Sequence, residues 1–107
     1  MKFLFALLAT LFFSAPVWAV EVTMGSNGNL VFDPDEITID SGEVLEFVNG
    51  MLPPHNIIVE GRPDLSRESL MFAAGEKQEI KFADAGDYNF WCGPHKGAGM
   101  TGVIHVK

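Results

Sequence analysis

Short runs of alternating apolar and polar residues, separated by glycine, proline, asparagine and aspartate, dominate this sequence. Successive side chains of a β-strand point to opposite faces, so this alternation predicts strands that are buried on one side. Short strands at regular spacing, with turn residues between them, favour a two-sheet sandwich over helical or βαβ folds. We therefore expect an all-β sandwich of about eight strands, at residues 20–24, 30–32, 36–39, 43–48, 56–59, 78–82, 87–92 and 101–106.

Residues 63–73 are the only stretch that could hold a helical turn. The sequence from Asp64 to Glu68 fits a helical turn weakly, so we expect at most one short helical turn, in this segment.

Residues 1–19 differ from the rest of the chain. Lys2 is their only charge, Phe3–Phe13 is almost wholly apolar, and small residues precede and include Ala19. This is the layout of a secretory signal peptide, and its apolar core is shorter than the roughly 20 residues that span a bilayer. A retained membrane anchor is the alternative, but no basic stop-transfer cluster follows. We expect cleavage after Ala19, which leaves one exported domain at residues 20–107 without an anchor.

The chain is acidic, with 14 Asp and Glu against 7 Lys and Arg and a formal net charge of −7. Such a charge argues against nucleic acid as a partner, because phosphate backbones bind basic surfaces. It is compatible with charge-steered association with a basic partner and equally with simple solubility.

Cys92 is the only cysteine, so no internal disulfide can form. Small exported domains usually pair their cysteines, and a leftover thiol suggests intermolecular pairing, a reactive group or a metal ligand. An inert buried thiol remains the alternative on this evidence alone.

The segment that begins at Cys92 brings His95 and Met100 within nine residues, and its linking residues are mostly glycine. Glycines allow a tight loop that can point three donors at one place. A second imidazole, His55, follows the pair Pro53–Pro54, which restricts the backbone before it.

Two imidazoles, one thiolate and one thioether are the ligands of a type 1, or blue, copper site for electron transfer. Structural zinc sites use more cysteine and rarely methionine. Iron–sulfur clusters and attached haem need more cysteines than this chain has. A Cys–His hydrolase lacks an evident Asn or Asp to orient the histidine and would leave Met100 unexplained. We therefore expect one copper ion cycling between Cu(I) and Cu(II), and no enzyme activity.

The remaining histidine and three of the other methionines are not expected to bind the metal. Alternation places His105 opposite the core face of the last strand, so we expect it to be exposed and inert. Met24, Met51 and Met71 are expected to pack in the interior.

The motifs Pro53–Ile57, Gly86–Phe90 and Cys92–Met100, with Leu30–Pro34 upstream, closely resemble the plastocyanin family in its small cyanobacterial form. The likeness extends over essentially all of residues 20–107. It implies a Greek-key, cupredoxin-like β-sandwich that carries electrons from cytochrome f to photosystem I. It also implies a monomer in the thylakoid lumen or periplasmic space of a cyanobacterium-like cell. An alternative within the same fold is a cupredoxin that donates electrons to a respiratory oxidase or reductase.

By position, the resemblance makes His55, Cys92, His95 and Met100 the copper ligands. Asn56 would link the His55 loop to the Cys92 loop and hydrogen-bond near the sulfur. A flat apolar face around His95, for docking of partners, would comprise Leu30, Leu52, Pro54, Gly97 and Ala98.

Two positions depart from the family pattern. Trp91 stands where the family usually has tyrosine, at a second docking site known from plant members, and an indole can still stack with a cationic partner. Lys96 stands where cyanobacterial members often have arginine, so the charge is kept but the bidentate fork is lost. Both are candidate docking residues.

Overall fold

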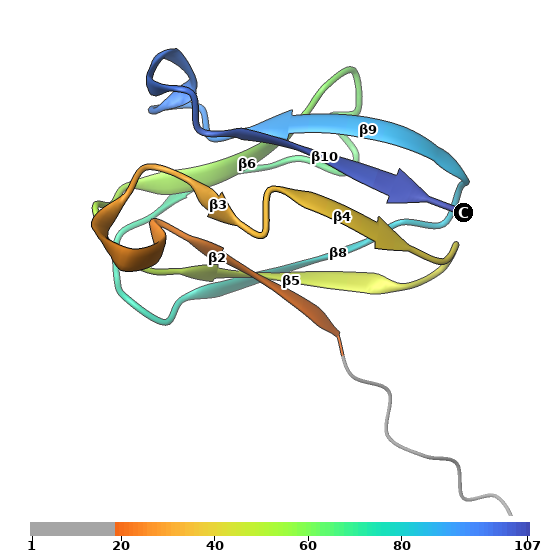
Figure 1. Ribbon diagram of the computed structural model, residues 1–107, viewed down its shortest axis with the longest axis horizontal. Coiled ribbons are helices and arrows are strands. Elements are labelled where there is room, and N and C mark those ends of the chain that lie inside the picture. Colours follow the sequence, from red (N-terminus) through yellow and green to blue (C-terminus); the bar gives the residue numbers. More distant parts are fainter. Residues whose placement is uncertain (1–18) are drawn as a thin grey trace, which may run out of the picture.

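The computed structural model describes residues 19–107, which form a β-sandwich of two facing sheets (Figure 1). The predicted all-β class is thereby confirmed. The proposed signal peptide falls on residues outside the described part, apart from Ala19. Within the described residues, no helix is long and apolar enough to cross a membrane.

The sheets contain nine strands among the described residues, one more than expected. The first sheet has the order β4-β10-β9-β6-β7, formed by Glu36–Ile39, Thr101–Val106, Gly86–Trp91, His55–Val59 and Arg67–Met71. The second has the order β3-β2-β5-β8, formed by Phe32–Asp33, Val20–Met24, Val44–Asn49 and Lys77–Lys81. Strand β4 runs parallel to β10 and β2 parallel to β5, whereas the other pairs are antiparallel.

The core lies between the sheets and is built from the apolar positions of the alternating runs. In β4 and β5 every second side chain is buried, as the period-2 pattern predicts. Phe32, Phe47 and Phe90 meet edge to face, with ring centroids 4.6 to 6.1 Å apart. Edge-to-face contacts of this kind add to the burial energy of the rings and join strands from both sheets.

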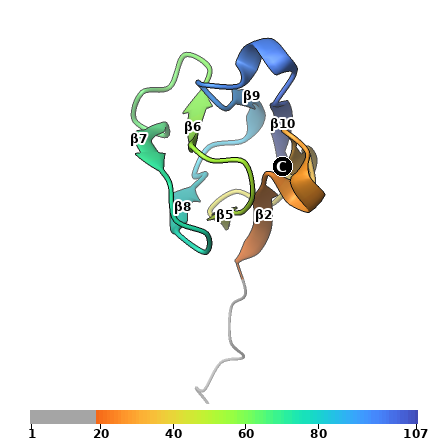
Figure 2. The same cartoon turned by 90° about the vertical axis from the view of Figure 1, so that its left-hand side faces the viewer.

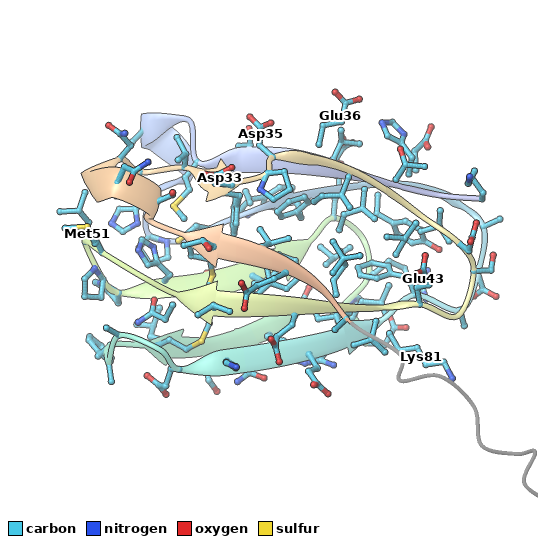
Figure 3. All side chains as sticks on the ribbon, turned by 60° about the horizontal axis from the view of Figure 1, so that its bottom comes forward. Asp33, Asp35, Glu36, Glu43, Met51 and Lys81 are labelled. Carbon is cyan, nitrogen blue, oxygen red and sulfur yellow. The ribbon has the colours of Figure 1, made fainter. Side chains whose placement is uncertain are left out.

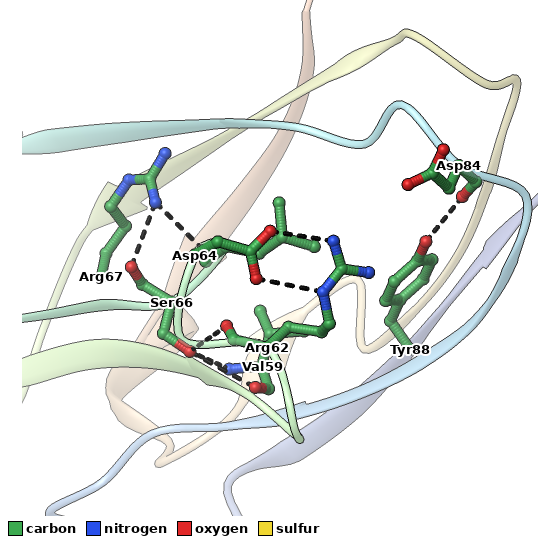
Figure 4. A network of polar contacts seen from close by, with 8 residues as sticks. Val59, Arg62, Asp64, Ser66, Arg67, Asp84 and Tyr88 are labelled. Atoms are coloured by element: carbon green, nitrogen blue, oxygen red, sulfur yellow. Dashed lines mark hydrogen bonds and ion pairs between the residues drawn. The ribbon is translucent and has the colours of Figure 1, made fainter.

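Within residues 63–73 the structure has a hydrogen-bonded turn, in which the Leu65 and Ser66 amides donate to the Arg62 carbonyl (3.1 Å each), followed by strand β7. The hydroxyl of Ser66 accepts a hydrogen bond from the Val59 amide (2.8 Å) and donates one to the Arg62 carbonyl (3.0 Å). Arg62 forms a bidentate pair with Asp64 (Figure 4). Strand β7 escaped prediction because it lies at a sheet edge, where only Met71 is buried and no alternation is required.

Two short 3₁₀ turns occur instead at Ser26–Gly28 (η2) and Lys96–Ala98 (η3). Turn η3 belongs to the loop between β9 and β10, and this loop lies at the end of the sandwich opposite the C-terminus (Figure 1). The loop between β5 and β6 reaches the same end, which faces the viewer in Figure 2. The fold therefore gathers at one end the segments that carry the predicted ligands.

Candidate metal centre

Three of the predicted ligands meet at this end of the sandwich. His55 begins β6, Cys92 follows β9 directly, and His95 lies in the loop that joins β9 to β10. The Cys92 Sγ atom is 3.7 Å from His55 Nδ1 and 3.6 Å from His95 Nδ1. One donor atom from each residue lies within 4.8 Å of the others. Strands distant in sequence thus bring a thiol and two imidazoles to one point.

His55 is fully buried, and its ring is oriented by the main chain. Its Nε2 atom is 2.7 Å from the carbonyl oxygen of Met51. A carbonyl only accepts hydrogen bonds, so Nε2 carries the proton and the lone pair of Nδ1 points toward Cys92. Gly25 packs against this contact: a Cβ atom there would overlap the Met51 carbonyl and lie 2.9 Å from His55 Nε2. The main chain therefore holds the ring in one orientation, with Nδ1 toward the other donors.

Cys92 is fully buried, and burial raises the pKa of its thiol above the ordinary value. The backbone amides of Asn56 and His95 oppose this effect by favouring the thiolate. A bound cation would convert such a thiol to the thiolate, because coordination deprotonates it outright.

His95 is half-buried, with its ring centroid 5.2 Å from that of His55. Burial, followed by the nearby His55, lowers the pKa of His95. The neutral imidazole is the form that binds a metal, so this environment favours ligation. The partial exposure of His95 also makes it the member of the cluster that a second molecule can approach.

Met100 closes the loop and is fully buried. Its carbonyl accepts a hydrogen bond from the Cys92 amide (3.0 Å), and its own amide donates to the His95 carbonyl (3.3 Å). Gly99 makes this return possible at φ 90°, a left-handed conformation that glycine adopts without strain. The loop thereby brings the main chain of Met100 back to Cys92 and His95.

Asn56 links the two ligand segments. Its side-chain oxygen accepts a hydrogen bond from the Gly93 amide (2.7 Å), and its side-chain nitrogen donates to the Glu68 carbonyl (3.0 Å). Gly93 follows Cys92 directly, so this bond lies beside the residue that carries the sulfur. Asn56 therefore joins β6, β7 and the loop after Cys92.

The residues expected to form an apolar face lie in the loops around this cluster. Leu52 is 46% exposed and stands at φ 60°, while Gly97 and Ala98 are exposed in η3. Leu30 and Pro54 are half-buried. The sequence interpretation missed Met51, which was assigned to packing but is 57% exposed at this end of the molecule (Figure 3). Its place before Leu52, in a turn, was the available signal.

Trp91 and Lys96, the two departures from the family pattern, contact each other. The Lys96 Nζ atom lies 3.7 Å from the centroid of the Trp91 ring. This is a cation–π contact, and it occupies one face of the indole within the chain itself.

His105 lies on the outer face of the first sheet and has no part in the cluster. It is half-buried, and it makes two polar contacts that the alternation did not predict. Its Nδ1 is 2.8 Å from Asp87 and its Nε2 is 2.8 Å from Glu36. Strand pairing causes this, because β10 lies between β9 and β4. Hydrogen bonds to Asp87 and then Glu36 raise the pKa of His105.

The cluster fits a copper ion on its own chemistry. With metal–donor bonds of about 2.0–2.3 Å, a thiolate and an imidazole in trigonal arrangement lie about 3.7 Å apart. The observed separations of 3.6 and 3.7 Å agree with this value. One thiolate and two neutral imidazoles form the trigonal donor set of type 1 copper.

Comparisons with known proteins agree with this chemistry. A model of the copper-binding proteins of the plastocyanin/azurin family matches residues 18–107. Plastocyanin from Nostoc punctiforme is 38% identical over 108 residues, covering 88% of this chain and 78% of that protein. Plastocyanin from Scenedesmus fuscus is 40% identical over 97 residues, covering 82% and 99%. Oxidised plastocyanin from Dryopteris crassirhizoma has a TM-score of 0.73 at 33% identity, covering 82% of this chain and 100% of that one. The resemblance and the copper cofactor inferred from the sequence are confirmed.

Proposed function

The chain belongs to the plastocyanin/azurin family of copper-binding proteins, and on that premise we propose that it carries single electrons from cytochrome f to photosystem I. It acts as a carrier and not as an enzyme. His55, Cys92, His95 and Met100 are the proposed ligands of one copper ion. The supporting observation is the position of Cys92 Sγ, 3.7 and 3.6 Å from the two imidazole nitrogens.

The protein's part in electron transfer is to hold its ligands still. Copper in such a site supplies reversible one-electron chemistry between Cu(II) and Cu(I). Met51 fixes the ring of His55, and Asn56 ties Gly93 to β6 and β7. These contacts restrain the donors, so little rearrangement accompanies a change of charge.

Partners are proposed to dock at the end of the sandwich around His95. Leu52, Gly97 and Ala98 are exposed beside it, and the small side chains of the latter two let another protein approach closely. Leu30 and Pro54 complete the proposed face, and we place Lys96 and Trp91 at its border. A shuttle needs a small, transient interface, and the net charge of −7 favours partners with a basic surface.

Residues 1–19 are proposed to be a signal peptide, and residues 20–107 the mature monomeric domain. Export would place the domain in the thylakoid lumen or periplasmic space of a cyanobacterium-like cell. N-terminal sequencing of the protein purified from cells tests this, since a mature chain that begins at Met1 would contradict it.

The decisive test of the site is the visible spectrum of the copper-loaded protein with oxidant and then with reductant. We expect an intense blue band from the copper–thiolate bond that disappears on reduction and returns on reoxidation, with one copper per chain. A colourless oxidised protein at full copper occupancy would overturn the proposal.

The choice of partners needs a separate measurement. We expect rapid oxidation of reduced cytochrome f by the Cu(II) protein, and rapid reduction of photo-oxidised photosystem I by the Cu(I) protein. Both rates should fall as the salt concentration rises. A blue protein that is slow with both partners, but fast with a respiratory oxidase or reductase, would support the alternative cupredoxin function.

A further inference from the structure

Lys96 reaches back across the segment that holds two of the proposed ligands. Trp91 is the last residue of β9, immediately before Cys92, and Lys96 begins η3, immediately after His95. The Lys96 ammonium lies over the Trp91 ring, 3.7 Å from its centroid. The contact therefore bridges the two ends of a short segment whose interior contains a thiol and an imidazole of the cluster.

The contact between Lys96 and Trp91 lies on the outer side of the loop. Trp91 points away from the core, since its neighbours Phe90 and Cys92 are buried and it is half-buried. Among residues 19–107 no carboxylate lies within 4 Å of the Lys96 ammonium. The cation is thus directed to the indole and is not shared with an ion pair.

The other restraints on the loop are hydrogen bonds. The Gly93 amide donates to the side chain of Asn56 (2.7 Å), and main-chain bonds run from the His95 amide to the Cys92 carbonyl and from the Ala98 amide to the His95 carbonyl. Gly93, Gly97 and Gly99 supply no side-chain contacts and increase the freedom of the chain. The stack between Lys96 and Trp91 adds a side-chain restraint across this flexible stretch.

We propose that Lys96 is a positioning residue that closes the Cys92–His95 segment by stacking on Trp91 and so slows the release of copper. The stack is a contact between two side chains of the chain itself, so it can be tested separately from the metal. Only its effect on copper rests on the function proposed above.

The first experiment tests the stack in the metal-free protein by tryptophan fluorescence. Trp91 and Trp18 are the two tryptophans of the chain, so Trp18→Phe is included wherever residue 18 is retained. In Lys96→Ala we expect quenching by acrylamide to increase about 1.5- to 2-fold, because one face of the indole is uncovered. Lys96→Arg should retain the protection, since a guanidinium also stacks on indole.

Lys81→Ala is the matched control, because Lys81 is also exposed but lies toward the opposite end of the sandwich (Figure 3). It should leave quenching unchanged. Equal quenching in the parent protein and in Lys96→Ala would overturn the proposal.

The second experiment follows copper transfer from the oxidised protein to an excess of chelator in a double-mutant cycle. Lys96→Ala and Trp91→Leu should each accelerate release about two- to fivefold, the range of an exposed cation–π contact. The double variant should be no faster than the faster single variant, because both remove the same restraint. If Lys96→Ala has its full effect in the Trp91→Leu background, charge alone is responsible and the stack is refuted as the cause.

The two proposals fail in distinguishable ways. A colourless copper-loaded parent protein would overturn the copper function while the fluorescence result still decides whether the stack exists. An intensely blue parent protein with unprotected Trp91 would overturn the stack and leave the copper function intact.

Discussion

The chain places its three histidines in two contrasting environments. At the loop end of the sandwich, His55 and His95 face a buried thiol, and burial together with His55 lowers the pKa of His95. On the outer face of the first sheet, His105 lies between two carboxylates, which raise its pKa. The surroundings of His95 favour the neutral imidazole, and those of His105 favour the imidazolium.

The difference shows that the partners of the two ring nitrogens decide whether a histidine can bind a metal. His55 has a main-chain carbonyl as the partner of its outer nitrogen, which leaves the inner nitrogen free to bind a metal. His105 has both nitrogens directed at acidic side chains from neighbouring strands, so neither is free. A cluster for binding metal and a cross-strand ionic contact are thus built from the same residue type.

The largest effect is expected from removing the thiol that distinguishes the two environments. Cys92→Ser should abolish the blue colour completely, because the copper–thiolate bond is its source, even where copper still binds through the imidazoles. Visible absorption and copper content, measured together, check this. His105→Ala is the control and should keep the full colour. Retained colour in Cys92→Ser would remove the basis for separating the two regions.

The packing behind His55 offers a second test of the loop end. Gly25 has φ 80°, and a Cβ atom there would overlap the Met51 carbonyl that orients His55. We expect Gly25→Ala to lower the free energy of unfolding by about 2–5 kcal/mol, from backbone strain and crowding together. Denaturant unfolding of the metal-free protein measures this loss, and copper affinity should fall with it.

Gly28 provides the matched control for that substitution. It has a similar φ of 76°, but a Cβ atom would meet no heavy atom within 4 Å. Gly28→Ala should therefore cost only the strain of the left-handed backbone, about 1–2 kcal/mol. Equal losses in the two variants would show that crowding against His55 is unimportant.

Asn56 tests how strongly the ligand loops are joined. Asn56→Ala leaves the Gly93 amide and the Glu68 carbonyl without their partner, which should cost about 1–3 kcal/mol of unfolding free energy. Asn89→Ala is the comparison, because the Asn89 side chain is exposed and, among residues 19–107, bonds only to Glu60 at 3.1 Å. It should cost less than about 0.5 kcal/mol. If both variants unfold alike, Asn56 does not hold the loops.

Local patterns in the sequence were sufficient to predict most of the fold. Alternation located strands such as β4 and β5, in which every second side chain is buried. Strand β6 was recognised as a short apolar run, and nearly all of its side chains are buried. Strand β7 was missed because an edge strand with only Met71 buried has no need to alternate. The turn before it depends on hydrogen bonds of Ser66 to residues 59 and 62, which no periodic pattern reveals.

For the candidate site, the sequence predicts the ligands but not the contacts of the other histidine. The types and spacing of Cys92, His95 and Met100 indicate their shared chemistry, because few metal sites use that combination. The role of His105 was not predictable in the same way. Its partners Glu36 and Asp87 lie 69 and 18 residues away, and only the order of β4, β10 and β9 brings them together. The exposure of Met51 likewise depends on the course of its loop.

The smallest effect concerns the outer histidine and depends on pH. Because the pKa of His105 is raised in the folded protein, its charged contacts stabilise the fold fully below the unfolded pKa of about 6.5. That stability is lost as the pH rises through the folded pKa. His105→Gln should therefore lower the melting temperature most near pH 5 to 6, and progressively less at alkaline pH. Thermal unfolding of the metal-free protein across this range checks the trend.

The contradicting outcome is a difference in melting temperature between the parent protein and His105→Gln that stays constant from pH 5 to 9. His105 would then act as a neutral hydrogen-bonding group, and it would differ from His95 in its position but not in its charge.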